Sequence, residues 1–405
     1  MNLMVSSVLS AISLRGASRV IGQCCSAFEL DIPIPSWTTT RLWLLKLGLH
    51  KLTREKPIAD DWIWIVDHTV QWGSEKCLLI VGLRLKTQPK KRALQFADLE
   101  PIALFPVKKS NGAVVYEQLQ EAAQKTGVPR AIISDGGPDL KSGLDQFMTE
   151  TNYTVHIYDI THRAALCFKS VLDADPNWNS FIELAGNARK YMCQTDVAAL
   201  SPPNQRSKAR YMNVDLLVRW ARKIATLSDD VCIELFGDLS QKNRCLGWLD
   251  YYQQDIDKWH RMVDVAESIV SWIQQHGIYR GVTQALRQQL STLQQAHCDQ
   301  SRAFQENLLQ YITQSEYKTY AGECLPGSSD CIESLFGKFK HIEKQQAASG
   351  FTSLLLALPA IIGQTSIEST KQAMENIRVK DVWEWFRVNV GQSLQSKRVL
   401  AFNQS

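Results

Sequence analysis

Asp61-Trp-Ile-Trp-Ile-Val-Asp67 is a run of β-branched and aromatic residues that ends in a carboxylate. This composition is typical of a buried strand. A second such run, Arg130-Ala-Ile-Ile-Ser-Asp135, ends in another aspartate before Gly136-Gly137-Pro138. Both patterns predict a carboxylate at the mouth of a sheet, where it is poorly solvated and attracts a counter-charge. The alternative for each aspartate taken singly is a turn cap, since Asp before Gly is ordinary turn chemistry.

The residues around these two runs predict the neighbouring elements. Strand character is found at 61–69, 75–86 and 99–109, with short polar turns between. The apolar period then changes, and 111–127 predicts a helix with Val114, Val115, Leu119 and Ala122 on one stripe. A strand at 130–135, a helix at 138–150 opened by Pro138, and a strand at 154–160 follow. The predicted order is therefore β-β-β-α-β-α-β.

A third acidic residue, Glu333, lies in a predicted helix. The loop Pro326-Gly-Ser-Ser-Asp330 holds the expected capping serine, and the apolar stripe is Ile332, Leu335, Phe336, Phe339 and Ile342. Glu323 and Glu343 lie nearby, and the alternative for Glu333 is a glutamate that only favours the first helical turn. Two strand-end aspartates and a helix-borne glutamate predict a two-metal site for phosphoryl transfer, occupied by Mg²⁺ or Mn²⁺.

The β-β-β-α-β-α-β order resembles the ribonuclease-H-like fold of DDE transposases and retroviral-type integrases. The resemblance implies an α/β fold with a mixed sheet flanked by helices, and it implies metal-binding and catalytic roles for Asp67, Asp135 and Glu333. It also implies two bound ions, cleavage at transposon ends and strand transfer into target DNA. The spacing from Glu333 to Lys340 resembles the end of one bacterial DDE signature, although Pro326 and Ser329 stand where that signature has Tyr and Arg.

Asp159-Ile-Thr-His162 resembles a Cys-or-Asp and His pair that several transposase superfamilies, the hAT group among them, carry after the fifth strand. Asp159 or Thr161 would cap the helix that begins near His162. His162 would then hydrogen-bond a carboxylate or a phosphate and so support the catalytic residues. The alternative is a plain connection between strand and helix.

Glu333 lies 198 residues after Asp135, which predicts an insertion. Residues 176–325 have helical periodicity, with Leu216, Leu217, Trp220 and Ile224 on one stripe and Val282, Leu286, Leu290, Leu293, Phe304, Leu308 and Tyr311 on another. An all-helical insertion again resembles hAT-type transposases. Trp248, Trp259 and Trp272 lie within it, and the resemblance makes them candidates for stacking on a base. The alternative is that they pack a helical core.

The net charge of the 405-residue chain is only +4, but basic residues cluster. One cluster holds Arg84, Lys90, Lys91 and Arg92, and another holds Lys338, Lys340 and Lys344 beside Glu333. Basic clusters near a carboxylate site suit a phosphate backbone. The alternative for each cluster is a solvated surface.

The N-terminal region predicts two short helices, at 13–22 and 36–48. Ser36 would cap the second, whose first turns carry Arg41 where a recognition helix contacts bases. A helix-turn-helix and a plain helical cap on the core are both open. The expected division is a DNA-binding region at 1–58, a first core part at 59–175, the insertion at 176–325, the Glu333 helix at 326–350 and a helical segment at 351–405.

The ten cysteines include no Cys-x-x-Cys, which indicates neither a zinc knuckle nor a disulfide framework. The expected location is a reducing cytoplasm, with nucleoid association in a prokaryote. No apolar stretch reaches the roughly 20 residues that span a bilayer. The expected partners are double-stranded DNA and, by the resemblance, at least one further copy of the chain. Two rivals stay open: a nuclease of the same fold without joining activity, and an inactive, transposase-derived DNA-binding protein.

Overall fold

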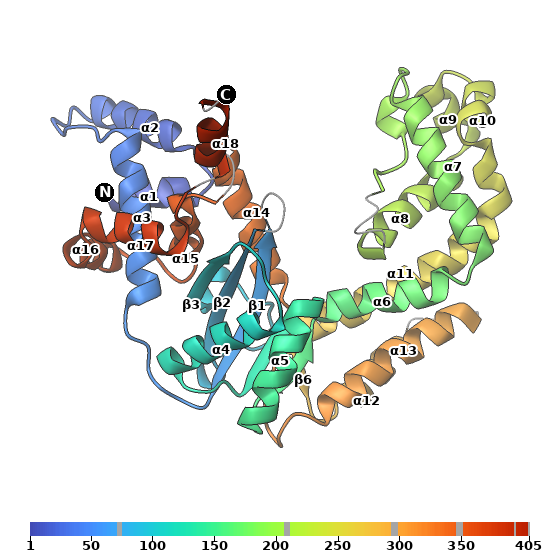
Figure 1. Cartoon of the computed structure of the whole chain (residues 1–405). Helices are drawn as coiled ribbons and strands as arrows, with labels where there is room; N and C mark the ends of the chain where they lie inside the picture. The colour runs from blue at the N-terminus through green and yellow to red at the C-terminus, as the bar shows by residue number, and fades with distance from the viewer. Residues whose placement is uncertain (71–74, 206–210, 293–298, 346–350, 393, 404–405) are drawn as a thin grey trace. The chain divides into compact units, whose positions relative to one another are not determined.

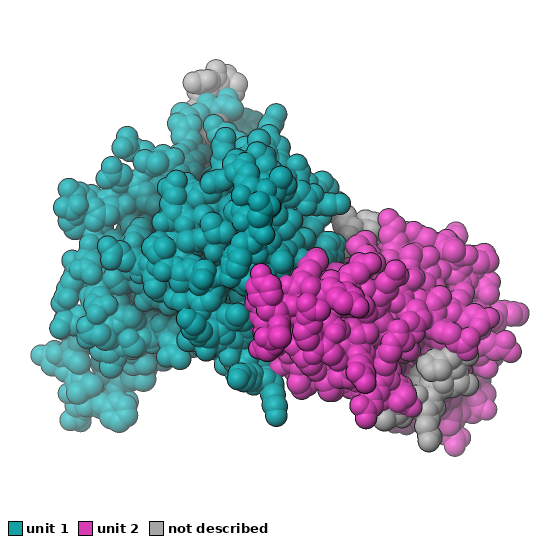
Figure 2. Space-filling model, turned by 90° about the horizontal axis from the view of Figure 1, so that it is seen from below, with its two compact units in different colours: residues 1–158, 328–405 teal, residues 159–327 magenta. Residues whose placement is uncertain are grey.

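The computed structural model describes residues 1–405 except 71–74, 206–210, 293–298, 346–350, 393 and 404–405. The chain divides into two compact units, which Figure 2 colours separately. Unit 1 comprises residues 1–158 and 328–405, and unit 2 comprises residues 159–327. Among the described residues, no helix is long and apolar enough to cross a bilayer.

Unit 1 is built on a five-stranded sheet in the order β3-β2-β1-β4-β5. β1 (Trp62–Val70) pairs antiparallel with β2 (Lys76–Arg84), which pairs antiparallel with β3 (Glu100–Val107). β4 (Ala131–Ser134) runs parallel to β1, and β5 (Val155–Tyr158) runs parallel to β4. The sheet is therefore mixed, and the predicted order of strands and helices along the chain is confirmed.

Two helices cover one face of this sheet. α4 (Gly112–Thr126) and α5 (Pro138–Thr151) pack on each other and lie in front of the strands in Figure 1. Their apolar residues share one core with Trp62, Trp64 and Val66 of β1. Val115, Leu119 and Ala122 are buried as predicted. Because side chains alternate along a strand, the odd-numbered residues of β1 lie on the opposite face.

The N-terminal and C-terminal helices pack together beside the sheet. These helices are α1 (Asn2–Leu9), α2 (Leu14–Ala27), α3 (Trp37–Thr53), α14 (Asp330–Lys344), α15 (Ala357–Ile361), α16 (Ile367–Asn376), α17 (Val379–Asn389) and α18 (Leu394–Asn403). α3 runs between α2 and the group α15–α17 and contacts β3 (Figure 1). Gly48 permits a close crossing, since a Cβ there would lie 1.7 Å from the carbonyl oxygen of Leu356.

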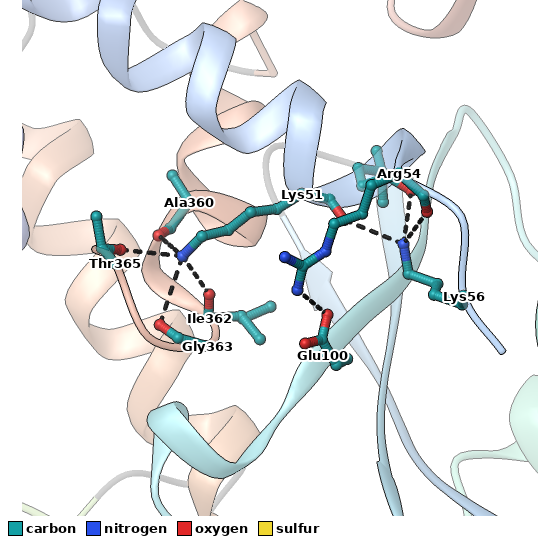
Figure 3. A network of polar contacts seen from close by, with 9 residues as sticks. Lys51, Arg54, Lys56, Glu100, Ala360, Ile362, Gly363 and Thr365 are labelled. Carbon is teal, nitrogen blue, oxygen red and sulfur yellow. Dashed lines mark hydrogen bonds and ion pairs between the residues drawn. The ribbon is translucent and has the colours of Figure 1, made fainter. Parts of the chain in front are cut away.

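Lys51 fastens α3 to the segment after α15 (Figure 3). Its side chain is buried, and its ammonium group donates to the carbonyl oxygens of Ala360 and Ile362 and to the hydroxyl of Thr365. A cation suits the end of a helix because the last carbonyl groups carry partial negative charge. α3 is thus a central helix of unit 1, and it extends five residues beyond the predicted end at residue 48.

Unit 2 is almost entirely helical, as the sequence predicted for the insertion. It contains α6 (Ile160–Leu172), α7 (Pro176–Met192), α8 (Val214–Ala225), α9 (Asp229–Phe236), α10 (Leu239–Leu246), α11 (Gln253–His276), α12 (Val282–Thr292), α13 (Asp299–Glu316) and the short pair β6 (Ile278–Tyr279) and β7 (Cys324–Leu325). The backbone N–H of Ile160 donates to the carbonyl of Gly327 at 2.9 Å. The two ends of unit 2 therefore meet.

One predicted stripe position differs from the structure. Leu216 is 53% exposed, because the buried stripe of α8 is formed instead by Val214, Leu217, Val218, Ala221 and Ile224. Leu293 lies outside the described residues. The compact units divide the chain at 158/159 and 327/328, and within unit 1 the N-terminal helices pack on the C-terminal helices and on β3. The expected domain boundaries stay a prediction.

Candidate active site

Asp67 lies in β1, and Asp135 directly follows the neighbouring parallel strand β4. In the pairing of β1 with β4, Ile63 is opposite Ala131 and Ile65 is opposite Ile133. Continuing this register by two residues brings Asp67 opposite Asp135, which directly follows β4. Neighbouring strands lie about 4.8 Å apart, so the two residues are close enough to act on one ligand.

Both aspartates belong to the same face of the sheet. Trp64 and Val66 of β1 and Ile132 of β4 point into the core under α4 and α5. Alternation therefore places Asp67 and Asp135 on the other face. α14 contacts β1, and α4 and α5 already cover the first face, so α14 lies against the face of the aspartates.

The turn after β4 is shaped by glycine. Gly136 has φ +71°, and a Cβ there would lie 2.3 Å from the ring of Tyr158. Glycine alone adopts this conformation readily and leaves room for the ring. Asp135 accepts a hydrogen bond from the backbone N–H of Gly137 at 3.0 Å through Oδ1, and α5 starts at Pro138. Asp67 accepts from the N–H of His68 at 2.6 Å, so local backbone bonds orient both carboxylates.

Behind the aspartates, on the face of α4 and α5, lies a second polar cluster. Lys76 Nζ is 2.6 Å from Asp139 Oδ2, and His68 Nδ1 is 3.9 Å from the same oxygen. Ser110 Oγ is 3.4 Å from His68 Nε2. Distances of 3.4 and 3.9 Å are too long for the hydrogen-bond relay of a nucleophilic serine.

The charges in this cluster follow from burial and partners. Burial lowers the pKa of His68 to about 4, against the opposing influence of Asp139, so the ring is neutral near pH 7. Burial also disfavours the ionised form of Asp139, but hydrogen bonds from Lys76 and Ser110 outweigh it and lower the pKa of Asp139 to about 2. Lys76 is therefore the counter-charge of Asp139 at neutral pH.

Glu333 lies in the first turn of α14, as predicted. The predicted stripe Ile332, Leu335, Phe336, Phe339 and Ile342 is buried, whereas Glu333 is exposed. A serine stands at the start of the helix, as predicted: Ser329 is the N-cap residue, and the hydroxyl of Ser328 accepts the N–H of Asp330 at 3.1 Å. Within the described ranges, His, Cys, Asp and Glu side chains nowhere gather in groups of three or more that could hold a metal ion. Glu333 therefore does not form a three-residue cluster with Asp67 and Asp135 in the described structure.

Glu323 and Glu343, the two other glutamates near Glu333 in the sequence, lie outside the first turn of α14. Glu323, in unit 2, is 9% exposed and accepts the N–H of Tyr320 at 2.8 Å. Glu343 is half-buried in the last turn of α14. The acidic residues of the first turn of α14 are Asp330 and Glu333.

The ligand types at the aspartates fit a divalent cation. Carboxylate oxygens are the ligands that Mg²⁺ and Mn²⁺ prefer. Thr69, two residues after Asp67 on the same face, is 1% exposed, and its hydroxyl has no hydrogen-bond partner in the described part of the chain. A buried polar atom without a partner is costly, which favours a ligand or water at this end of the sheet.

Asp159 and His162 lie at the start of unit 2. Asp159 is fully buried and accepts the N–H of His162 at 2.8 Å, so the predicted capping of α6 by Asp159 is confirmed. The predicted support of the catalytic carboxylates stays a prediction.

The basic candidates fall into two groups. Arg84 pairs with Asp61 and lies over Trp62, and Arg92 makes two hydrogen bonds to Asp98. The other candidates that are engaged within the fold are Lys338, which lies 5.5 Å from the ring centroid of Phe96, and Arg41, which donates to Ser353 at 2.8 Å. Lys90, Lys91, Lys340 and Lys344 are exposed. These four lysines suit a phosphate contact better, because a paired cation must first give up its partner.

The three tryptophans of the insertion differ in access. Trp259 is fully buried and donates to Asp175 at 3.1 Å, so its ring faces cannot receive a base in this structure. Trp248 is half-buried and packs edge-on against Phe181. Trp272 is half-buried and stacks on His276 at 4.3 Å between ring centroids.

Sequence reasoning missed the cluster of His68, Lys76, Ser110 and Asp139. The signal within reach was His68 directly after Asp67, and Asp139 in the first turn of the helix after Asp135. These residues come together through the pairing of β1 with β2 and the packing of α5. A local sequence pattern predicts neither.

No protein-family model matches the chain, and no curated protein matches it. Among solved structures, the chain is similar to a Drosophila P element transposase strand transfer complex. The two are 14% identical, with a TM-score of 0.38, over 90% of this chain and 93% of that chain. This likeness is too weak to assign the chain to a family.

Proposed function

We propose that this chain is a DNA transposase with a ribonuclease-H-like core, which cleaves transposon ends and transfers the strands to target DNA. The observation that carries the proposal is the parallel register of β1 with β4, which, continued by two residues, sets Asp67 opposite Asp135. The observed order of elements, with a large helical insertion before the helix of Glu333, supports it.

Asp67 and Asp135 would hold the divalent cations, Mg²⁺ or Mn²⁺, with Glu333 as the third ligand. Such ions supply activation of water or of a DNA 3′-hydroxyl and stabilise the leaving oxygen. Glu333 stands on a helix that contacts β1, and the proposal requires it to reach the aspartates when DNA and the ions bind. The aspartates themselves are kept in place by backbone hydrogen bonds, which limits the rearrangement that ion binding requires.

The DNA would be held by exposed lysines of unit 1. Lys340 and Lys344 share α14 with Glu333, and both are exposed. Lys90 and Lys91 add positive charge on the connection between β2 and β3. Phosphate contacts of this kind position DNA without reading its sequence. Asp159 and His162 would support the carboxylates, and Trp248 or Trp272 would stack on a base.

The test is Mn²⁺-dependent cleavage and joining of supercoiled DNA that carries the sequences flanking the gene. Wild type is compared with Asp67→Asn, Asp135→Asn and Glu333→Gln, and Asp145→Asn on the exposed face of α5 is the matched control. Loss of cleavage in the first three variants, with retained DNA binding and an active control, supports the proposal. Activity in Glu333→Gln would remove Glu333 from the ligand set.

The same assay separates the two rivals. Cleavage without joining, and without preference for the flanking sequences, would identify a nuclease. DNA binding by a wild type that never cleaves would identify an inactive, transposase-derived binding protein. An oligomer of at least two chains on paired DNA ends is expected of the transposase alone.

A further inference from the structure

Asp135 lies just past the end of the β ladder. β4 ends at Ser134, and the pairs between β1 and β4 end at Ile65 and Ile133. The hydrogen bond from Gly137 to Asp135 is internal to the turn, so it does not fix the turn relative to β1. The level placement of the two aspartates therefore depends on what holds the start of α5 against β1 and β2.

The pair of Lys76 and Asp139 provides a direct polar link of this kind. Lys76 is opposite Val70 in the ladder, at the start of β2, and it shares its face with His68. Asp139 lies in the first turn of α5, and Lys76 Nζ is 2.6 Å from its Oδ2. A Cβ built on Gly137 would lie 3.6 Å from a carboxylate oxygen of Asp135 and 3.6 Å from one of Asp139, so the two carboxylates flank the same glycine.

The surroundings make this pair stronger than a surface ion pair. The side chain of Asp139 is 12% exposed, that of Lys76 is 31% exposed, and the neutral ring of His68 is 7% exposed. A buried carboxylate that loses its partner is costly, because its charge then has no compensation. Movement of α5 away from β2 is therefore disfavoured as long as both charges are present.

We propose that the Lys76–Asp139 ion pair is a positioning device that holds the turn of Asp135 level with Asp67. This inference rests on the proposed function, since it concerns how the two carboxylates meet one cation. Asp139 and Lys76 do not touch the ion or the DNA in this proposal. They act through the start of α5, in the way that residues around a metal site orient its ligands.

The test measures Mn²⁺ binding by the full chain without DNA, as the Mn²⁺ concentration that gives half of the maximal rise in melting temperature. We expect Asp139→Asn and Lys76→Met each to raise this concentration by about 10–100-fold. The double variant should be no worse than either single variant, because both remove one interaction. Lys76→Arg keeps the charge and should restore most of the affinity, and Asp145→Asn is the control on α5.

Each result bears on the inference. If Asp139→Asn lowers the melting temperature but leaves the Mn²⁺ dependence unchanged, the pair is structural and the inference is overturned. If Asp139→Asn does not fold, Lys76→Met answers the same question, since its side chain is more exposed. Asp67→Asn separates the two proposals. If Mn²⁺ raises the melting temperature of Asp67→Asn as it does that of wild type, the proposed metal site is wrong, and the inference falls with it.

Discussion

Lys51 donates a hydrogen bond of 2.6 Å to the carbonyl oxygen of Ile362, which lies 311 residues further along the chain. The lysine is 1% exposed, and it also donates to Ala360 and Thr365. One side chain near the N-terminus therefore organises the segment that follows α15. A buried ammonium group with several carbonyl partners is satisfied, but its burial still disfavours the charged form.

This burial predicts a pH dependence of stability. Burial lowers the pKa of Lys51 from 10.5 to about 8. Between these pH values the unfolded chain binds more protons than the folded chain, so the free energy of unfolding rises with pH there, by at most about 1.4 kcal/mol per pH unit for one group. The cost of burying the charge is fully present below pH 8.

The measurement is urea denaturation of wild type and Lys51→Met between pH 7 and 10.5, with exposed Lys141→Met as control. The comparison separates the effect of Lys51 from that of Lys56, because burial also lowers the pKa of Lys56 to about 8. We expect wild type to gain stability relative to Lys51→Met as pH rises through this window. Parallel curves would mean that Lys51 stays protonated in the fold.

A methyl group at Gly48 should break the crossing of α3 with the segment before α15. A Cβ there would lie 1.7 Å from the carbonyl oxygen of Leu356, a backbone atom that cannot rotate away. We expect Gly48→Ala to lower the free energy of unfolding by about 1–3 kcal/mol or more. Gly186→Ala in α7 is the control, because a Cβ there meets nothing within 4 Å and alanine favours a helix by about 1 kcal/mol. Equal effects of the two substitutions would refute the close crossing.

Lys340 and Lys344 should contribute to DNA affinity regardless of sequence. We expect the double variant Lys340→Ala/Lys344→Ala to weaken binding to specific and random duplexes alike, and to reduce the salt slope of binding by about one per lysine. Arg92→Ala should have a smaller effect, because Arg92 is paired with Asp98. Fluorescence anisotropy at several salt concentrations provides the test, and an unchanged slope in the double variant would exclude phosphate contacts by these lysines.

Trp259 should matter for folding and not for DNA. Trp259→Phe removes the hydrogen bond to buried Asp175 and should lower the free energy of unfolding by about 1–3 kcal/mol. Binding of DNA with an unpaired terminal base should be unchanged at temperatures where the variant is folded. Trp248→Ala is the companion measurement, and a loss of binding confined to Trp259→Phe would contradict the core role.

The sequence predicted the parts of the fold that depend on local chemistry. The runs that became β1 and β4, the cap at Asp159 and the buried stripe of α14 all follow from residue type and period. Leu216 differs from the prediction because a shift of one position turns a side chain by about 100° around the helix, so its neighbour Leu217 is buried and Leu216 is exposed.

The candidate site was predictable in part. The strand ends gave Asp67 and Asp135, but their level placement depends on the register between β1 and β4, which lies outside any local window. Lys76 and Asp139 are 63 residues apart, and Lys51 and Ile362 are 311 apart. Contacts over such separations are set by the packing of whole elements.

The hydrogen bond between Ile160 and Gly327 joins the two ends of unit 2. A domain whose ends meet can be inserted into another domain at a single place, because unit 1 needs only two adjacent attachment points to accommodate it. Lengthening or exchanging such a domain leaves the loop-closure entropy of unit 1 almost unchanged. Residues 159–327 could therefore diverge in size and sequence far faster than the sheet that carries Asp67 and Asp135.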